Sequence, residues 1–389
     1  MQEYNTIIGN LFNSVDRRVF KRIVNKHQGE RYAKSMTCWE QFVAIFLGQI
    51  LKNCNSLRDI EDFLLTNQNQ WYHLGIKHRI ARSTLSYANN TKSWLIYSDL
   101  FYYLLNKLKI KSTFFQDINP VKIIDSTPIY LNLNLFDWAT ETIRIKGMKI
   151  HIVYDLHQQK PNCFTFSKAT CNDIEEGKLV DIQSGVTYVF DRGYMDFNWW
   201  NDIDSKGAYF VTRLKRNNAI IELSEIQQDT EEISSQLIRL KNKNLTHSGK
   251  NRCSEKILRK VIVQCADKSP LILVTNDLTR SIKEIAELYK QRWQIELFFK
   301  WIKQNLQIKQ FLGRSENAVK TQICIALISY LLIQEARELK ELMSEVCKNF
   351  SESKFLKMIN NNIFKTLKPK QYGRTRDNPW QLRLKFNYL

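Results

Sequence analysis

The first third of the chain has hydrophobic positions at helical spacing. They recur every three or four residues over Trp39–Leu51, Leu57–Leu65 and Trp94–Leu108, with short polar breaks between these segments. Residues 1–112 also contain no proline, a residue that would interrupt a helix. The pattern therefore predicts a helical region over residues 1–112.

Part of this region has the outline of a helix-turn-helix. Ser56–Thr66 would form the first helix, Gly75 would lie in the turn, and the second helix would begin near Arg82. The side chains that this second helix would present to DNA are Arg82, Tyr87, Asn89 and Asn90. Packed helix pairs are common, so an ordinary helical bundle is an equally good interpretation.

From Val121 the pattern changes to short hydrophobic strands separated by turns. The expected strands are Val121–Leu131, Lys149–Leu156, Cys163–Ala169, Val186–Phe190 and Ala208–Leu214. The first three are joined by short turns, and helices are expected around Asp173–Gly185 and Asn198–Asp204, before the last two strands. Three consecutive strands followed by alternating helices and strands are the order of a ribonuclease-H-like core. The predicted fold class is therefore α/β, with a mixed sheet of that type.

A second β-rich segment interrupts this core between Lys215 and Ser269. Strands are expected at Ala219–Ile226, Ile233–Leu240 and Lys256–Gln264, and residues 239–260 hold eight basic residues against one acidic residue. A short strand, Leu271–Thr275, and helices from Ser281 to about Leu342 would complete the core. The predicted organisation is a helical DNA-binding region (1–112), a catalytic core in two parts (118–214 and 270–345), a basic β-rich insertion (215–269) and a basic C-terminal region (346–389).

Composition narrows the class of protein. The 389 residues include 58 Lys and Arg against 39 Asp and Glu, a net charge of +19, and this excess favours a polyanionic partner, nucleic acid foremost. The eight cysteines form no C-x-x-C pair, so neither a zinc knuckle nor a disulfide framework is indicated. The longest apolar run, residues 323–333, is shorter than a membrane-spanning helix, and no secretory signal is visible. A soluble cytoplasmic protein with no membrane contact is expected.

Three acids lie where a carboxylate is energetically costly. Asp125 lies within the first strand, Asp191 directly follows the fourth, and Glu296 lies in a helix rich in large apolar residues. Such carboxylates need a partner charge, and in a nuclease that partner is Mg²⁺, which prefers oxygen ligands. Two such ions about 3.5–4 Å apart stabilise the attacking and leaving oxygens of a phosphoryl displacement. The three acids could hold two Mg²⁺ (or Mn²⁺) ions in this way.

The helix around Glu296 carries a polar stripe. At 100° per residue, Tyr289, Arg292, Glu296 and Lys303 all fall within about 60° of its circumference. The remaining surface is apolar, formed by Leu288, Ile295, Leu297, Phe298, Phe299, Trp301 and Ile302. This predicts a helix buried on nearly all sides except the stripe, which would face a site. The alternative is that Arg292 and Glu296 form only an intrahelical ion pair.

These residues resemble the signature of a known family. Tyr289-x₂-Arg292-x₃-Glu296-x₆-Lys303 matches the Tyr-(2)-Arg-(3)-Glu-(6)-Lys signature of the IS-four (insertion sequence four) family of bacterial DDE transposases. The segments 125–127 (Asp-Ser-Thr) and 191–194 (Asp-Arg-Gly-Tyr) resemble its first two acidic motifs. Residues 275–277 (Thr-Asn-Asp) resemble its strand before the last helix. The resemblance covers residues 121–306.

The resemblance implies an activity and its partners. Asp125, Asp191 and Glu296 would bind two divalent ions for cleavage at the ends of an insertion sequence and strand transfer into target DNA. Tyr289 with Arg292 and Lys303 would hold the element end, since guanidinium and ammonium groups suit phosphate oxygens. The expected partners are double-stranded DNA, as terminal inverted repeats and as target, and a second copy of the chain, because two DNA ends must be paired.

Several assignments stay open. Arg213 and Lys215 follow the fifth strand and could contact DNA or simply be a solvated strand end. Two other functions also fit the sequence. One is a catalytically inactive, element-derived DNA-binding protein, and the other is a different two-metal nuclease with a ribonuclease-H-like core.

Overall fold

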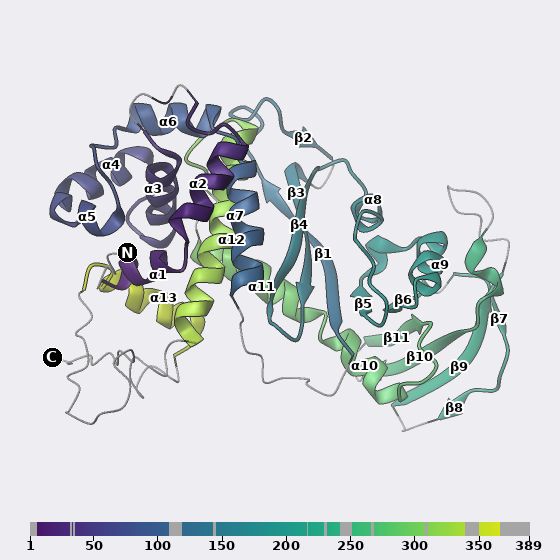
Figure 1. Cartoon of the computed structure of the whole chain (residues 1–389). Helices are drawn as coiled ribbons and strands as arrows, with labels where there is room; N and C mark the ends of the chain where they lie inside the picture. Colours follow the sequence, from purple (N-terminus) through teal and green to yellow (C-terminus); the bar gives the residue numbers. More distant parts are fainter. Residues whose placement is uncertain are drawn as a thin grey trace, which may run out of the picture. The chain divides into compact units, whose positions relative to one another are not determined.

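The computed structural model describes residues 6–108, 119–338 and 350–365, except residues 32, 34–35, 143–144, 216, 229–231, 242–250, 266–267, 307 and 309. It divides into two compact units (Figure 1). The helical unit comprises residues 1–111, 134–138 and 300–389, and the sheet unit comprises residues 112–133 and 139–299. Residues 300–338, which the sequence places in the second part of the core, thus belong to the helical unit.

The helical unit packs its helices around α12. Its helices are α1 (Ile7–Asn13), α2 (Arg17–Lys26), α3 (Cys38–Ile50), α4 (Leu57–Thr66), η1 (Gln68–Gln70), α5 (Trp71–Leu74), α6 (Arg82–Thr91), α7 (Leu95–Lys107), the end of α11, α12 (Glu316–Glu338) and α13 (Glu352–Asn361). The α12 helix contacts α7, α3 and α6. Among the described residues it is the one helix long and apolar enough to cross a membrane, and 83% of its 18-residue apolar stretch is buried inside the structure. It is therefore the core helix of this unit.

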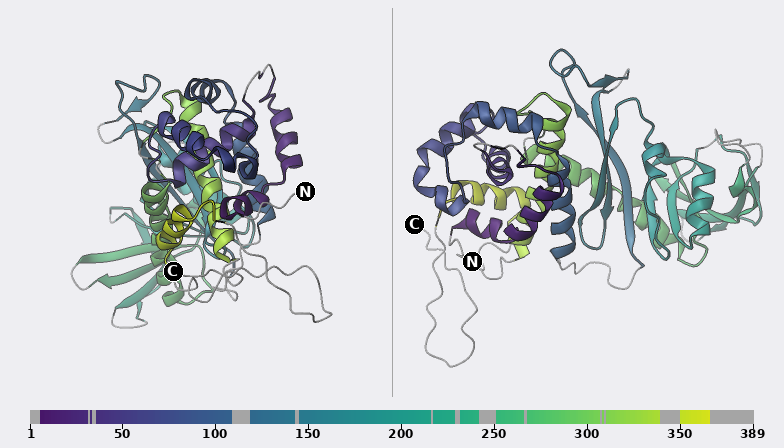
Figure 2. Two further views of the ribbon diagram at one scale, coloured as in Figure 1. Left: turned by 90° about the vertical axis from the view of Figure 1, so that its left-hand side faces the viewer. Right: turned by 45° about the horizontal axis from the view of Figure 1, so that its top comes forward.

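The two ends of the described chain meet in the helical unit. The backbone N–H groups of Ile7 and Ile8 donate to the carbonyl oxygens of Lys365 and Ile363, at 3.2 and 3.1 Å. The right-hand view of Figure 2 shows the purple N-terminal helices close to the yellow α13. The described part of the C-terminal region, residues 350–365, is thus packed on the N-terminal helices, and the rest of the predicted basic tail lies outside the described residues.

Within the described residues, eleven strands form one sheet in the sheet unit. The strands are β1 (Val121–Tyr130), β2 (Thr140–Glu141), β3 (Lys146–Asp155), β4 (Lys160–Lys168), β5 (Thr187–Phe190), β6 (Tyr209–Arg213), β7 (Ile220–Glu222), β8 (Gln227–Gln228), β9 (Ile233–Leu240), β10 (Leu258–Cys265) and β11 (Lys268–Thr275). The helices of this unit are α8 (Asp173–Gly177), η2 (Arg192–Tyr194), α9 (Phe197–Ser205), η3 (Arg252–Glu255), α10 (Ile282–Lys290) and the start of α11 (Trp293–Asn305). The five strands expected for the core all form.

The strand order confirms the predicted fold class. The core strands lie in the order β4-β3-β1-β5-β6, with β3 antiparallel to both β1 and β4. The β5 strand is parallel to β1 and to β6, and α9 connects β5 to β6. An antiparallel three-stranded meander extended by parallel strands with helical crossovers is the topology of a ribonuclease-H-like fold.

The β-rich insertion extends the core sheet rather than forming a separate sheet. The β11 strand pairs with β6 on one side and with β10 on the other, and β9 and β7 follow in order. The left-hand view of Figure 2 shows these teal-to-green strands side by side. The expected strands at 233–240 and 256–264 correspond to β9 and β10. Residues 242–250 of the basic segment lie outside the described residues.

Aromatic side chains fill the core between this sheet and α9. Phe190 on β5 lies 4.8 Å from Trp199 and 6.3 Å from Phe210 between ring centroids, and Trp200 lies 5.1 Å from Phe210. All four side chains are buried. This packing fixes the end of β5, from which the chain continues directly into Asp191.

Candidate active site

Asp125 lies in the centre of the sheet, on β1. It pairs in register with Ile152 of β3, while β5 flanks β1 on the other side. The side chain is 16% exposed, and one oxygen, Oδ1, accepts a hydrogen bond of 2.8 Å from the N–H of Ser126. The sequence forms a strand here because β-branched residues precede the acid, and the strand carries the carboxylate into the interior.

Asp191 follows the neighbouring parallel strand. Ile124 of β1 is paired with Phe190 of β5, so the next residue on each strand is an acid. Asp191 is the N-cap of η2, and its Oδ1 accepts a hydrogen bond of 2.7 Å from the N–H of Gly193. The two acids are therefore placed at one point of the sheet by strand register alone.

Arg292 connects Glu296 to Asp125. Its Nη2 donates a hydrogen bond of 2.5 Å to Glu296 Oε1, and its Nη1 donates one of 3.1 Å to Asp125 Oδ2. The Arg292 and Asp125 side chains are 18% and 16% exposed, whereas Glu296 is 32% exposed, so the ion pair with Asp125 is the better shielded of the two. The intrahelical pair considered in the sequence does form, but the same arginine also reaches the first acid.

The pKa of Asp125 reflects both its burial and the nearby acids. It is raised to about 7, mainly by burial and next by the negative charge of Asp191, with a smaller effect of Glu296 in the same direction. The Ser126 N–H and Arg292 act against this rise. The three predicted acids thus lie within electrostatic reach of one another, with one arginine as their counter-charge.

Tyr289 and Arg213 lie beside this group. Tyr289, near the end of α10, is buried, and Arg292 lies 5.9 Å from the centroid of its ring. Burial raises the pKa of Tyr289, while the positive charges of Arg292 and Arg213 lower it. Arg213 ends β6, and Lys215 is exposed two residues further on. Of the predicted DNA contacts, Tyr289, Arg292 and Arg213 are therefore grouped near the acids.

A groove of about 1170 Å³ runs past Arg292. One wall is formed by residues of α10, the turn after it and the start of α11: Lys283, Ala286, Glu287, Tyr289, Lys290, Arg292 and Trp293. The other is formed by Glu232 and the strand residues Ile233, Val263 and Leu271. Trp293 is 57% exposed, an unusual position for a large aromatic side chain. Sequence reasoning missed this residue.

The single helix and its stripe are corrected by the structure. The chain leaves the helix at Gln291 and Arg292, so Tyr289 lies on α10 whereas Glu296 and Lys303 lie on α11. A count of 100° per residue does not apply across this break. The apolar side is also less buried than expected, because Leu297 is 44% exposed. Lys303 lies in the helical unit, beyond the division between residues 299 and 300, and its DNA contact stays a prediction.

The expected helix-turn-helix is only partly formed. The α4 and α6 helices are present and in contact, but η1 and α5 lie between them, which is longer than the usual turn of three or four residues. Arg82 and Tyr87 on α6 are exposed. Asn89 is not available to DNA, because it is buried and its Oδ1 accepts a hydrogen bond of 2.8 Å from Gln41.

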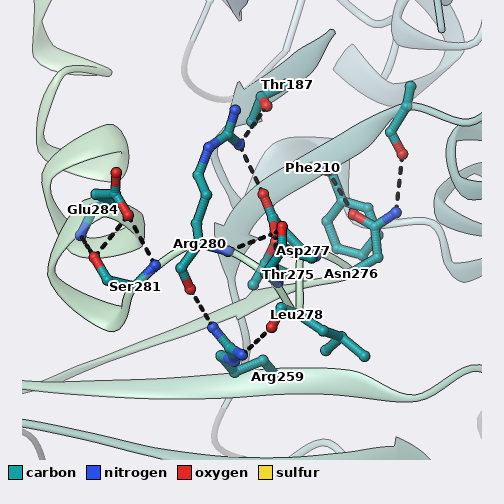
Figure 3. A network of polar contacts seen from close by, with 12 residues as sticks. Thr187, Phe210, Arg259, Thr275, Asn276, Asp277, Leu278, Arg280, Ser281 and Glu284 are labelled. Atoms are coloured by element: carbon teal, nitrogen blue, oxygen red, sulfur yellow. Dashed lines mark hydrogen bonds and ion pairs between the residues drawn. The ribbon is translucent and has the colours of Figure 1, made fainter. Parts of the chain in front are cut away.

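A polar network fastens the start of α10 to the sheet (Figure 3). Asp277 is buried and accepts hydrogen bonds from Thr279 and from Arg280, whose Nη1 also donates to Thr187 Oγ1 at 2.7 Å. Figure 3 shows Arg259 of β10 reaching the carbonyl oxygens of Leu278 and Arg280 from the opposite side. The loop that precedes α10 is thereby joined to β5 and to the insertion.

The donor atoms of the site suit a hard divalent cation. Asp125, Asp191 and Glu296 offer only carboxylate oxygens, and the positive charge now between two of them is the guanidinium of Arg292. No group of three or more His, Cys, Asp and Glu side chains is close enough to hold a metal ion in the part of the chain that is described. The residue types fit such an ion, and the Arg292 guanidinium bonds to two of the three acids.

Comparison with known proteins gives a consistent result. Residues 118–332, more than half of the chain, match the family described as Transposase DDE domain, and residues 3–77 match a domain of unknown function, DUF4372. The "Putative transposase y4zB" of Sinorhizobium fredii is 37% identical over 264 residues, which are 66% of this chain and 72% of that protein.

Two further relatives and one solved structure were also found. The "Probable transposase for insertion sequence element IS5377" of Geobacillus stearothermophilus is 30% identical over 216 residues, 55% of this chain and 56% of that protein. A Synechocystis protein described as a transposase for IS4SA is 24% identical over 306 residues, 76% of this chain and 80% of that protein. The piggyBac transposase synaptic complex with hairpin DNA aligns with 93% of this chain and 81% of that chain, at a TM-score of 0.45 and 12% identity.

Proposed function

The chain belongs to the family of DDE transposases, and from this we propose that Asp125, Asp191 and Glu296 are its catalytic acids. The observation that carries the proposal is the register of β1 and β5, which sets Asp125 and Asp191 at adjacent strand positions. The Arg292 bridge then links Glu296 to Asp125, although they come from distant parts of the chain.

We propose that the three acids hold two Mg²⁺ or Mn²⁺ ions. The support is the oxygen-only donor set and the raised pKa of Asp125, which is caused first by burial and then by the negative charges of Asp191 and Glu296. Bound ions would supply Lewis-acid activation of water and stabilisation of the oxygens around the phosphorus. The chain's own part is to hold the three carboxylates on rigid elements and to keep the site partly shielded from solvent.

The DNA contacts would come from the side chains around this site. Arg292 can offer a two-pronged guanidinium to a phosphate once it leaves the acids, and Arg213 and Tyr289 lie close to it. Lys215 and Lys303 would extend the contact along the backbone, and Arg82 would contribute from the helical unit. The groove beside Arg292 is lined by Lys283 and Lys290 against Glu232 and Glu287, so Arg292 gives the lining an excess of one positive charge, which supports the passage of a polyanion here.

The reaction would be two successive phosphoryl transfers. In the first, water attacks the phosphorus at the element end, the bond to the 3′ oxygen breaks, and that oxygen takes up a proton. In the second, the freed 3′ hydroxyl attacks a target phosphodiester, loses its proton, and displaces the target's own 3′ oxygen. A homodimer would pair the two element ends, and the enzyme would act on chromosomal DNA in the bacterial cytoplasm.

The experiment that tests this proposal separates cutting from binding. Asp125→Ala, Asp191→Ala and Glu296→Ala are each expected to abolish Mn²⁺-dependent cleavage of DNA that carries the inverted repeats flanking this gene. Binding of the same DNA, followed by fluorescence anisotropy, should stay largely intact. Glu141→Ala, which changes a 57% exposed acid of the same unit, is the control.

The outcome also separates the alternatives. Retained cutting by one of the three variants would remove that residue from the active site. Absence of cutting by the wild-type protein, with DNA binding intact, would favour the inactive element-derived DNA-binding protein. Cleavage independent of the inverted repeats would favour a different two-metal nuclease.

A further inference from the structure

Asp173 is an acid near the site that no sequence motif singled out. It is the first residue of α8, and its Oδ1 accepts a hydrogen bond of 2.9 Å from Lys149 Nζ on β3. The same ammonium group donates 2.8 Å to the carbonyl oxygen of Cys171. The Lys149 side chain is only 11% exposed. Two bonds from one buried cation therefore fasten the start of α8 to the sheet.

The other oxygen of Asp173 faces the segment that carries Asp191. A Cβ atom placed on Gly193 would lie 3.3 Å from Asp173 Oδ2 and 2.9 Å from Asp191 Oδ1. The two carboxylates thus flank one backbone position, which has room because residue 193 is glycine. Asp191 Oδ1 also accepts the Gly193 N–H, so the orientation of the Asp191 carboxylate depends on where this backbone lies.

The end of α8 contacts the same segment a second time. A Cβ atom on Gly177 would lie 2.8 Å from the ring of Tyr194, so the helix end and this ring are in direct contact. Tyr194 is fully buried. Burial raises the pKa of Tyr194, and the negative charges of Asp125, Asp173 and Asp191 add to the rise. All three acids are therefore close to this ring.

We propose that Asp173, held by Lys149, is a positioning residue for Asp191. It fixes the backbone of residues 191–194 and with it the direction in which the Asp191 carboxylate points. Lys149 also neutralises Asp173, so that two adjacent carboxylates do not repel each other at full strength. The inference rests on the proposed role of Asp191 in metal binding, and groups that orient metal ligands typically change metal affinity by 10- to 100-fold when they are removed.

The test measures Mn²⁺ binding to the full chain by calorimetry, without DNA. Asp173→Asn is expected to lower the Mn²⁺ affinity by about tenfold or more. The neutral amide would bind Lys149 more weakly than the carboxylate does, and residues 191–194 would be held less firmly. Gly193→Ala should have a similar effect, since its Cβ must displace one of the two carboxylates. The control is Glu175→Gln, two residues along α8, where the side chain is 59% exposed.

A second measurement distinguishes positioning from folding. High Mn²⁺ concentration is expected to restore cleavage by Asp173→Asn toward the wild-type rate, but not cleavage by Asp191→Asn. Wild-type Mn²⁺ affinity in Asp173→Asn, or cleavage that excess Mn²⁺ does not restore, would overturn the inference. Failure of the proposed function looks different: Asp191→Asn would then bind Mn²⁺ and cut DNA as the wild type does.

Discussion

The guanidinium of Arg292 donates a hydrogen bond of 3.1 Å to Asp125, a residue 167 positions earlier in the chain. Its second nitrogen donates to Glu296, so a protein cation stands between two of the proposed metal-binding acids. Two carboxylates near each other in a partly buried site need a counter-charge. Arg292 supplies it in the free protein, and a divalent ion would compete for the same two oxygens.

Replacement of Arg292 by glutamine should therefore raise the affinity of the DNA-free protein for Mn²⁺. Glutamine keeps hydrogen-bonding groups but carries no charge to compete with the ion. Calorimetric titration of wild type and Arg292→Gln measures the effect directly. A lower Mn²⁺ affinity in the variant would mean that Arg292 helps to assemble the acids instead of competing with the metal.

The same substitution should weaken binding to element-end DNA. Loss of one phosphate contact lowers the slope of log affinity against log salt concentration by about 0.9. Anisotropy titrations at several salt concentrations measure this slope. An unchanged slope would place Arg292 away from the DNA backbone.

The raised pKa of Asp125 predicts how stability depends on pH. The folded protein holds a proton up to about pH 7, whereas the unfolded chain releases it near pH 3.8. Stability should therefore fall as the pH rises between these values, by up to about 4 kcal/mol. An asparagine at this position cannot ionise, so the metal-free Asp125→Asn variant should not lose stability as the pH rises. It should therefore melt at a higher temperature than wild type at pH 8 and at a similar temperature below pH 4. If Asp125→Asn instead melted at a lower temperature than wild type at pH 8, the buried Asp125 charge would not be the cause of the loss of stability.

The buried Asp277–Arg280 pair should be important for stability. The side chains are 2% and 11% exposed, and Asp277→Asn would leave the Arg280 charge uncompensated. Breaking such a pair costs about 3–5 kcal/mol, which urea denaturation can measure. Glu284→Gln is the matched control, because it alters an exposed capping box four residues from Arg280. Glutamine can still close this box, so the change should cost only about 0.3–1 kcal/mol, from the lost charge in the first turn. If both variants lost the same free energy of unfolding, burial of the Asp277–Arg280 pair would not increase the cost of breaking it.

Local pattern was enough to single out the three acids that the structure brings near one another. Asp125 and Asp191 could be found because each lies in or directly after a hydrophobic strand, and adjacent parallel strands bring such positions together. Glu296 could be found because it interrupts an apolar helix. Both features are set by residues close in sequence, and hydrophobic periodicity reports on such local patterns.

Long-range contacts account for what the sequence did not predict. Residues 282–305 contain neither proline nor glycine, so nothing in the sequence marks the break at Gln291 and Arg292. The partly buried Arg292, whose side chain bonds to Asp125 and Glu296, lies in this break. The pairing of β6 with β11, which makes the insertion part of the core sheet, likewise joins segments that no local signal connects.

The helical unit offers a last test, because two predicted DNA contacts on α6 have opposite environments. Arg82 is exposed, so Arg82→Ala should weaken DNA binding and reduce its salt slope by about 0.9 with little change in stability. Asn89 is buried and bonded to Gln41, so Asn89→Ala should lower the free energy of unfolding by about 1–3 kcal/mol and leave the DNA affinity of the folded protein unchanged. Measuring affinity and stability on both variants is decisive, since a DNA-contacting Asn89 would show the reverse: weaker DNA binding without loss of stability.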